Sequence, residues 1–298
     1  MAGSIFLTGA SGFLGRRLLF LLRACPDRKI FCLVRTKPTE IQPTNVECVL
    51  GDLLGSHNYE EKLAACDAVV HLAAATGKHA PEEYIRINRD GSKALIAAAR
   101  RAGVRRFVHV STIAVKFGDK SNYPYARSKE QAEIAVKQSS LHWTIVRPTM
   151  IFGEHAPVLD GLSRLAGLPL VPVFGDGSTP VQPILGDDLA ASLMAILEDE
   201  SLIGQTMEIG GPEVVSIENL LLRIRSSMGK GGARVVHLPA RPIAASLGWL
   251  EPWLRPLLPF TAGQLASFTN AGTISPDSWV EARQVGMKSV DEMLRYKQ

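Results

Sequence analysis

The chain has 298 residues, of which 46% are hydrophobic, so it is long enough to bury a large core and to carry a smaller lobe beside one main domain. Its formal net charge of +4 at pH 7 is modest. The basic residues occur in scattered pairs such as Arg100 and Arg101, without aromatic residues between them, and this pattern argues against a nucleic-acid surface.

The four cysteines, at positions 25, 32, 48 and 66, lack the spacing of a metal site, so we expect no bound metal ion. Cys32 and Cys48 lie inside apolar runs, as buried free thiols do in a reducing compartment. The first residues lead directly into an apolar run, which leaves no room for a signal peptide. No apolar run reaches the roughly 18 residues that would suggest a membrane-spanning helix. Together these features predict a cytoplasmic location.

A glycine-rich turn follows the predicted first strand, residues 4–8, and opens a predicted apolar helix. Gly9 lets the chain turn, Gly12 lets backbone N–H groups approach a pyrophosphate, and Gly15 lets the helix pack against the strand. The amides at the start of that helix are then expected to bind the anion. A tight structural turn is the alternative, but the strand before and the helix after favour a dinucleotide site. The residues expected at this site are Thr8, Gly9, Ser11, Gly12, Phe13, Leu14 and Gly15.

The glycine spacing G-x-x-G-x-x-G resembles that of the short-chain dehydrogenase/reductase family, in particular its extended and atypical branches. The resemblance implies an α/β fold of the Rossmann type, in which a doubly wound parallel sheet carries helices on both faces. It also implies a nicotinamide dinucleotide at the carboxyl edge of that sheet.

A second buried strand is predicted at residues 29–34, and it ends at Arg35. About 20 residues beyond the glycines, an acidic residue would bind the ribose 2′-OH of NAD, whereas a basic residue accommodates the 2′-phosphate of NADP. Here no carboxylate occurs before Glu40. The sequence therefore favours NADP(H) over NAD(H), while an arginine that only stacks on the adenine would leave NAD(H) open.

Two further strands are predicted at residues 46–50 and 68–75. The family resemblance places Asp52 beside the adenine, but an Asp at this point is equally typical of a turn or a helix cap. His71 lies inside the later strand and is expected to be a core histidine rather than a catalyst. The segments after these two strands supply the remaining cofactor contacts that we expect on this side, from Asp52, Leu53, Leu72, Ala73 and Ala74.

Tyr125 and Lys129 are four residues apart on a predicted helix, so they project from nearly the same face, about 6 Å apart along its axis. The lysine charge favours the tyrosinate form, which suits Tyr125 to act as general acid/base on a substrate oxygen. By the family resemblance, Lys129 also holds the nicotinamide ribose hydroxyls. A chance pair on an exposed helix face is the alternative, and the position of this pair between two strands favours a genuine site. The nearby Tyr123 lacks a lysine at this interval.

The third catalytic group is expected to be a hydroxyl at the end of the predicted strand 108–112. By resemblance, the family uses a Ser or Thr there to hydrogen-bond the reacting oxygen. The spacing from Gly118 that many sugar-nucleotide epimerases show would place it at Ile113. Either a one-residue shift lets Thr112, the preferred candidate, or Ser111, the second, supply the hydroxyl, or no residue supplies it.

The passage from Arg147 to Gly153, after a predicted strand at 143–146, resembles the family's R-P-x-x-x-x-G segment beside the nicotinamide, to which Pro148 and Met150 belong. Residues 154–183 are rich in Gly and Pro and are expected to form an insertion rather than sheet. Basic residues that could bind a diphosphate are scarce there, and apolar residues dominate. We therefore expect an apolar or lipid-like substrate.

The remaining predicted elements are helices at 82–101, 187–197 and 216–228, the last capped by Ser216, and strands at 206–211 and 234–238. The resemblance gives Asn88, in the first of these helices, a structural bond to the backbone of a neighbouring strand. The expected Rossmann core is 1–150, completed by about 184–212, and the substrate lobe is 151–183 with 213–298.

Residues 243–260 are apolar and contain three prolines. Such a stretch could lie on a membrane surface, cover the substrate, pack onto a partner subunit or belong to the core of the lobe. A homodimer is the habit of the family.

Over its full length the chain resembles the atypical branch that contains the nucleotide-binding accessory subunit of respiratory complex I and bacterial proteins described as NAD-dependent epimerase/dehydratase. Many of those relatives lack the Tyr/Lys pair, so its presence here favours chemistry. The main hypothesis is an NAD(P)-dependent oxidoreductase or epimerase acting on a hydroxyl or carbonyl of a small molecule. The alternatives are a non-catalytic NADP(H)-binding subunit or regulatory protein, and a nucleotide-sugar epimerase/dehydratase.

Overall fold

The computed structural model describes residues 3–37, 43–232, 234–254, 261–275 and 286–295. The chain divides into two compact units, each built from several segments. The first consists of residues 1–112, 128–147 and 186–207, and the second of residues 113–127, 148–185 and 208–298. The domain boundaries drawn from the sequence stay a prediction.

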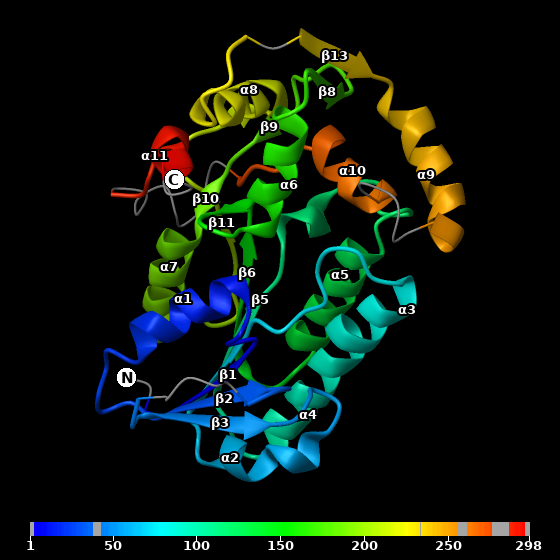
Figure 1. Ribbon diagram of the computed structural model, residues 1–298. Coiled ribbons are helices and arrows are strands. Elements are labelled where there is room, and N and C mark those ends of the chain that lie inside the picture. The colour runs from blue at the N-terminus through cyan, green and yellow to red at the C-terminus, as the bar shows by residue number, and fades with distance from the viewer. Residues whose placement is uncertain (1–2, 38–42, 233, 255–260, 276–285, 296–298) are drawn as a thin grey trace. The chain divides into compact units, whose positions relative to one another are not determined.

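A seven-stranded sheet runs through the described part of the chain in the order β3-β2-β1-β4-β5-β6-β11 (Figure 1). Neighbouring strands from β3 to β6 pair in parallel, and the order reverses at β1, which lies between β2 and β4. The predicted doubly wound α/β fold is confirmed. The strands are β1 (Ile5–Thr8), β2 (Ile30–Val34), β3 (Val46–Leu50), β4 (Ala68–His71), β5 (Arg106–Val110), β6 (His142–Pro148) and β11 (Thr206–Ile209).

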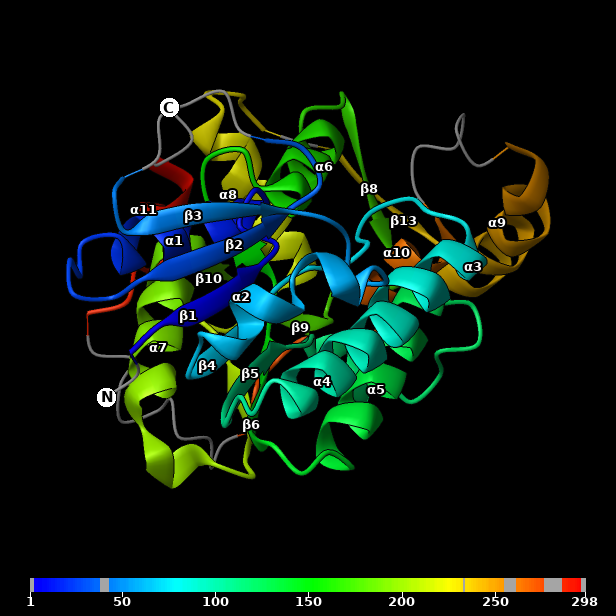
Figure 2. The ribbon, with the colours of Figure 1, turned by 90° about the horizontal axis from the view of Figure 1, so that it is seen from below.

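Helices cover both faces of this sheet, which explains why its strands are continuous apolar runs. Phe6, Val69 and Phe107 stand side by side in the strand register and pack in one buried cluster with side chains of α2, α4 and α5. Helices α1 and α7 pack together on the other face (Figures 1 and 2). The helices are α1 (Phe13–Leu22), α2 (Glu60–Ala64), α4 (Ser92–Arg101), α5 (Pro124–Lys137) and α7 (Gly186–Glu198).

The helix predicted over residues 82–101 is interrupted. The chain forms α3 (Pro81–Tyr84), then a π-helix over Ile85–Gly91, and only then α4. The wider π turn takes up an extra residue in the middle of the helix. The spacing of the apolar residues does not reveal the π-helix, because this wide turn serves a contact between Asn88 and another part of the chain, which is described below.

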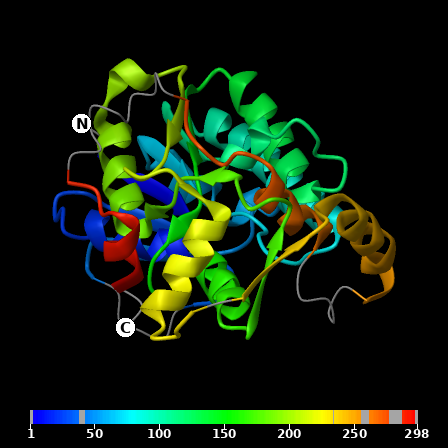
Figure 3. The ribbon, with the colours of Figure 1, turned by 90° about the horizontal axis from the view of Figure 1, so that it is seen from above.

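The second unit is built from short paired strands and helices. Strand β8 (Leu170–Phe174) pairs in parallel with β13 (Arg234–Leu238), and β7 (Ile151–Phe152) pairs in parallel with β10 (Ile184–Leu185). Strand β9 (Pro180–Val181) pairs with β12 (Val215–Ser216) in the antiparallel direction. Ser216 caps α8 by accepting a hydrogen bond from the amide of Asn219 (3.2 Å), as predicted. Figure 3 shows α11, in red, beside α8, in yellow. The helices of this unit are α6 (Pro157–Ala166), α8 (Ile217–Ser227), α9 (Ala240–Leu254), α10 (Ala262–Thr269) and α11 (Val290–Arg295).

The expectation that residues 154–183 lack sheet is wrong, because this segment contains β8 and β9. Pro172 stands in the middle of β8, which belongs to a two-stranded sheet. Proline is tolerated in such an edge strand, where one side of the strand has no ladder partner. The Gly and Pro content of the segment therefore led to a wrong prediction, because β8 forms by pairing with β13, which lies more than 60 residues away in sequence.

None of the helices in the described ranges is long and apolar enough to cross a membrane.

Candidate functional site

The glycine turn follows β1 at the point where the strand order of the sheet reverses. Gly9 has a backbone φ of 75°, in the left-handed region that favours glycine, and a Cβ there would lie 2.7 Å from the amide nitrogen of Ala73. A Cβ on Gly15 would lie 1.9 Å from the carbonyl oxygen of Gly9. The absence of these two side chains is therefore what lets α1 begin so close to the end of β1.

Helix α1 begins at Phe13, and Gly12 precedes it without a side-chain capping bond. The first turn of α1 contains no acidic side chain, so the helix does not neutralise the partial positive charge of its own N-terminus. The first amides of a helix have no acceptor within the helix. These amides, beside a cradle that Cβ atoms would fill, fit a bound diphosphate. Ser11 is exposed at this turn, and Leu14 is half-buried.

Arg35 and Asp52 follow β2 and β3, the strands on one side of β1. Arg35 is exposed directly after β2. Asp52 accepts hydrogen bonds at Oδ1 from the amides of Leu54 (2.8 Å) and Gly55 (3.1 Å), so it holds the turn after β3, and Leu53 is buried beside it. The turn role of Asp52 is present in the structure, and its contact with an adenine stays a prediction.

The predicted catalytic helix carries Tyr125 and Lys129 one turn apart on α5. Tyr125 belongs to the second unit and is half-buried, with its ring centroid 5.8 Å from that of Tyr123. Lys129 belongs to the first unit. Pro148, which is buried, and Met150, which is half-buried, belong to the second unit.

The side chain of Lys129 is buried, with 2% of its surface exposed. Its ammonium group donates a hydrogen bond to the carbonyl oxygen of Val110 (2.8 Å) and contacts Nε2 of His109 at 3.3 Å. Burial lowers the pKa of Lys129 from 10.5 to about 8, and the negative charge of Glu133 opposes that shift. Glu133 is itself held in a two-bond pair with Arg147, at 2.8 and 2.6 Å. Lys129 is thus a cation that loses its proton near pH 8, more than two pH units below an exposed lysine.

The two candidate hydroxyls differ in their surroundings. Ser111 is buried, its amide donates to the carbonyl oxygen of Val146 (2.6 Å), and its Oγ has no hydrogen-bond partner among the described residues. Thr112 is half-buried. An unpartnered buried hydroxyl beside Val110, the strand residue that holds Lys129, fits a site that receives a polar group. The choice between Thr112 and Ser111 stays a prediction.

A row of buried polar side chains crosses the sheet in register, and the sequence analysis missed it. Thr8, His71 and His109 stand side by side on β1, β4 and β5, and each is fully buried. They lie on the same face as the apolar cluster under α4 and α5, since Phe6, Val69 and Phe107 precede them by two residues. Each of these three apolar strands has a polar residue near its end, and this shared position is the sequence signal that could have revealed the row.

The hydrogen bonds of this row have one consistent direction. The amide of Ala73 donates to Thr8 Oγ1 (3.2 Å), and Ser92 Oγ donates to the carbonyl oxygen of Asn88 (2.6 Å). Between them, Thr8 Oγ1 and Ser92 Oγ each lie 2.8 Å from one ring nitrogen of His71. The ring therefore accepts at Nδ1 and donates from Nε2. Burial, with the charge of Lys129 as a smaller cause, lowers the pKa of His71 to about 3, so the ring is neutral. The prediction that His71 is a core histidine is confirmed.

The π-helix turns the buried side chain of Asn88 toward the loop after β4. Its Oδ1 accepts from the amide of Ala75 (2.7 Å), and its Nδ2 donates to the carbonyl oxygen of the same residue (3.1 Å). Nδ2 also lies 2.9 Å from Ser128 Oγ, next to Lys129. The predicted bond from Asn88 to neighbouring backbone is present, and it fixes the loop that carries Leu72, Ala73 and Ala74.

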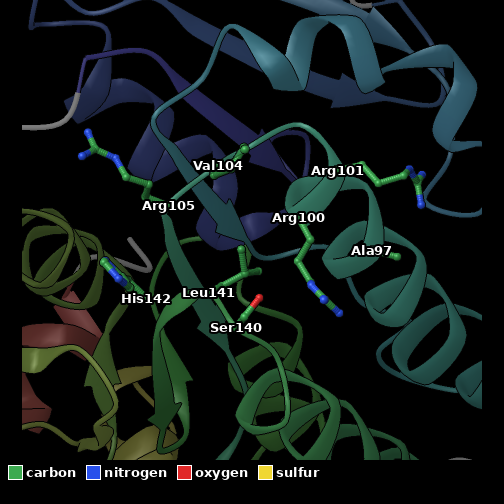
Figure 4. A pocket seen from close by; sticks show the side chains of 9 residues that line it. Ala97, Arg100, Arg101, Val104, Arg105, Ser140, Leu141 and His142 are labelled. Carbon is green, nitrogen blue, oxygen red and sulfur yellow. The ribbon is translucent and has the colours of Figure 1, made fainter.

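A hollow of about 570 Å³ lies at the opposite edge of the sheet, where β5 and β6 begin (Figure 4). In Figure 4 the side chains of Arg105 and His142 extend to the left and those of Arg100 and Arg101 to the right, so the four do not converge on one point. Arg101 is paired with Glu60 at 2.7 Å. Arg100 and Arg101 stand in the last turn of α4, where cations stabilise the carbonyl end of a helix. The hollow therefore has a structural explanation. Its basic side chains are those of Arg100, Arg101, Arg105 and His142.

The apolar residues of the 154–183 segment are mostly core of the second unit. Leu159, Leu162, Val171, Val173 and Phe174 are all buried. They fill the interior of their own unit, so their abundance is not in itself an argument for an apolar substrate. The predicted surface role of residues 243–260 also stays a prediction. Within that stretch Leu247 is buried, and residues 255–260 lie outside the described part of the chain.

A model of a family described as NAD(P)H-binding matches residues 9–160. The chain belongs to this family. Ceramide reductase from Caulobacter vibrioides is 37% identical to it over 197 residues, which cover 65% of this chain and 60% of that protein. An uncharacterized sugar epimerase from Bacillus subtilis is 33% identical over 214 residues, covering 69% of this chain and 92% of that protein.

Two broader similarities cover nearly the whole chain. Subunit 9 of the NADH dehydrogenase [ubiquinone] 1 alpha subcomplex from Arabidopsis thaliana is 26% identical over 298 residues, covering 95% of this chain and 72% of that protein. The solved structure of UDP-glucuronic acid 4-epimerase from Bacillus cereus, in complex with UDP-glucuronic acid and NAD, has the same fold. Its TM-score is 0.73 at 20% identity, with coverage of 99% of this chain and 97% of that one. The predicted kinship with the extended and atypical short-chain dehydrogenases/reductases is confirmed.

Proposed function

We propose that this NAD(P)H-binding protein is an NADP(H)-dependent reductase that interconverts a ketone and a secondary alcohol on an apolar substrate. The observation that carries the proposal is the buried ammonium group of Lys129. It donates a hydrogen bond to the backbone of β5 and lies one helical turn from Tyr125 on α5. A scaffold that only stored a nucleotide would not need a lysine whose pKa lies near 8.

In the proposed reaction, a bound nicotinamide would supply the hydride for reduction and would accept it for oxidation. Tyr125 donates its phenolic proton to the carbonyl oxygen as the alcohol forms, and takes that proton back in the reverse direction. The positive charge of Lys129 favours the tyrosinate that proton donation leaves behind. Thr112, or Ser111 in its place, donates a hydrogen bond to the same substrate oxygen.

The apolar character of the substrate is supported by ceramide reductase, whose name describes a lipid substrate. Since this chain spans only 60% of the length of that protein, the substrate class is carried over as part of the proposal. The sugar epimerase from Bacillus subtilis supports the second candidate, a nucleotide-sugar epimerase.

Replacing Tyr125 with phenylalanine tests the role of the phenol. We expect Tyr125→Phe to lower kcat for NADPH-dependent reduction of long-chain ketones by about 10²- to 10⁴-fold, because general acid catalysis contributes that much. Binding of NADPH, followed by its fluorescence, is expected to change little. Tyr123→Phe is the matched control, since it removes a neighbouring hydroxyl from a tyrosine that stacks on Phe117.

Four outcomes of this comparison have different meanings. Turnover of ketones by wild type but not by Tyr125→Phe supports the reductase. Turnover of UDP-sugars alone would replace the apolar substrate with a nucleotide sugar. Equal turnover by wild type and Tyr125→Phe on every substrate would contradict the proposed acid/base, and nucleotide binding without any turnover would favour the non-catalytic subunit.

The preference for NADP(H) is supported by Arg35, which is exposed at the end of the strand next to β1. Arg35→Glu is expected to lower the ratio of NADPH to NADH affinity at least tenfold, since an acidic residue there prefers the 2′-OH. Arg23→Glu makes the same charge change at the other end of α1 and should leave the ratio unchanged. An unchanged ratio in Arg35→Glu would show that another residue reads the ribose.

A further inference from the structure

The hydrogen bonds of Lys129 account for most of its donors. An ammonium group has three N–H donors and no acceptor. Val110 O and His109 Nε2 both lie on β5, and their contacts at 2.8 and 3.3 Å use two of the three. The direction of the third N–H is then fixed by tetrahedral geometry, so strand β5 determines where the lysine can donate.

His109 serves this contact only in one form of its ring. Because the ammonium can only donate, Nε2 must accept, and the ring proton resides on Nδ1. That nitrogen is buried and has no hydrogen-bond partner among the described residues. Such a ring lowers the stability of the fold at a fully buried position in a β-strand, since an apolar residue would fill the volume without leaving an unpaired N–H. The acceptor that the ring supplies to the Lys129 ammonium is the interaction that offsets this cost.

The charged and titratable groups around Lys129 come from four elements of the first unit, α5, β6, β5 and β4. Glu133, four residues on along α5, carries the opposite charge and is paired with Arg147 of β6. His109 approaches from β5, and His71 of β4 packs against it with ring centroids 5.1 Å apart. Burial, Lys129 and His71 together hold the pKa of His109 well below its ordinary value, so this neighbour stays a neutral acceptor across the working pH range.

We propose that His109 is a positioning residue for the reaction: its Nε2 holds the ammonium of Lys129 in its charged form and in one orientation, so that the remaining N–H is directed to the cofactor ribose while the positive charge favours the tyrosinate of Tyr125. The inference deepens the proposed function and rests on it for the role of Lys129. His109 acts only through the lysine and touches neither the substrate nor the cofactor.

The test compares three variants of β5. His109→Phe keeps a ring of similar volume without the acceptor, and His109→Gln keeps an acceptor without the ring. Phe107→Leu is the matched control, because Phe107 is equally buried on the same face of the same strand and has no contact with Lys129 among those described above. The affinity for NADPH is measured by its fluorescence from pH 6 to 10, which requires no turnover.

We expect the wild-type affinity to weaken as Lys129 loses its proton, with a midpoint near pH 8. Loss of a hydrogen bond to a charged group should move that midpoint down by about one to two pH units in His109→Phe, and should weaken binding at pH 8 by roughly tenfold. His109→Gln should restore most of the wild-type midpoint, and Phe107→Leu should leave it in place. A midpoint in His109→Phe equal to that of wild type, or moved as far by Phe107→Leu, would overturn the inference.

The same midpoint can be read without a nucleotide. For each variant, the free energy of unfolding is compared with that of its Lys129→Met derivative over the same pH range. The pH at which this difference begins to rise reports the folded-state pKa of Lys129. A lowered midpoint in a protein that reduces no ketone would therefore support the positioning role of His109 while the proposed reaction failed, so the two outcomes are distinguishable.

Discussion

Replacing Lys129 with methionine should change how the stability of this protein depends on pH. The side chain is 2% exposed, and burial is the main cause that lowers its pKa from 10.5 to about 8. One pKa unit corresponds to about 1.4 kcal/mol. Keeping the ammonium charged inside the folded protein therefore costs about 3 kcal/mol relative to the neutral amine, and Lys129→Met removes that titration.

The sign follows from the protons bound in each state. Below pH 8 Lys129 is protonated in both the folded and the unfolded chain, and the full cost is present. Between pH 8 and 10.5 the unfolded chain still binds a proton that the folded protein has released, so stability rises with pH in this window. The free energy of unfolding of wild type minus that of Lys129→Met should thus increase by about 3 kcal/mol from pH 7 to 10.5.

Urea unfolding of the nucleotide-free proteins, followed by tryptophan fluorescence, measures this difference. Cys32, Cys66 and Tyr59 have pKa values raised to about 12 by burial, and they lower stability at alkaline pH in both proteins. Their contribution cancels when the two curves are subtracted. A difference that stays flat within about 1 kcal/mol from pH 7 to 10.5 would refute the reasoning, because it would mean that Lys129 is not buried as a cation.

Two further substitutions test the turn and the polar row. Gly15→Ala should abolish nucleotide binding and lower the free energy of unfolding in urea by about 1–3 kcal/mol, because the new Cβ meets backbone at 1.9 Å. Gly161→Ala is the control: its Cβ, on the exposed face of α6, meets nothing within 4 Å, so this change should stabilise the protein by up to about 1 kcal/mol. Similar urea curves for the two alanine variants would contradict the close packing of α1 on β1. Thr8→Val keeps the shape of the side chain but leaves a ring nitrogen of His71 and the amide of Ala73 without a partner. It should therefore lower the free energy of unfolding by about 1–3 kcal/mol. An unchanged free energy of unfolding would show that the row of buried polar side chains adds no stability.

The local features of this protein were readable because neighbouring residues determine them. Gly9 and Gly15 are required by the turn that they themselves build, and the backbone of Gly9 has the left-handed φ that its position demands. Ser216 caps the helix that begins one residue later. The strands were predicted from short, continuous apolar runs, and the parallel, doubly wound sheet was implied by the family resemblance.

Features made by distant parts of the chain could not be read in this way. Thr8 and His71 are 63 residues apart, and His109 joins them only because β5 pairs with β4 in one particular register. The π-helix exists where Asn88 must reach a loop 13 residues earlier, and the strand Leu170–Phe174 exists because a later segment pairs with it.

The spacing of Tyr125 and Lys129 predicted that both residues lie on one helix, but the protonation state of the lysine was decided by tertiary structure. Position along a helix sets only the direction in which a side chain leaves the backbone. Whether that side chain keeps its proton depends on how much water surrounds it and which groups it meets. For Lys129 those groups, Val110, His109 and Glu133, are brought together by the sheet and the helix that packs on it, and this assembly lowers its pKa to about 8.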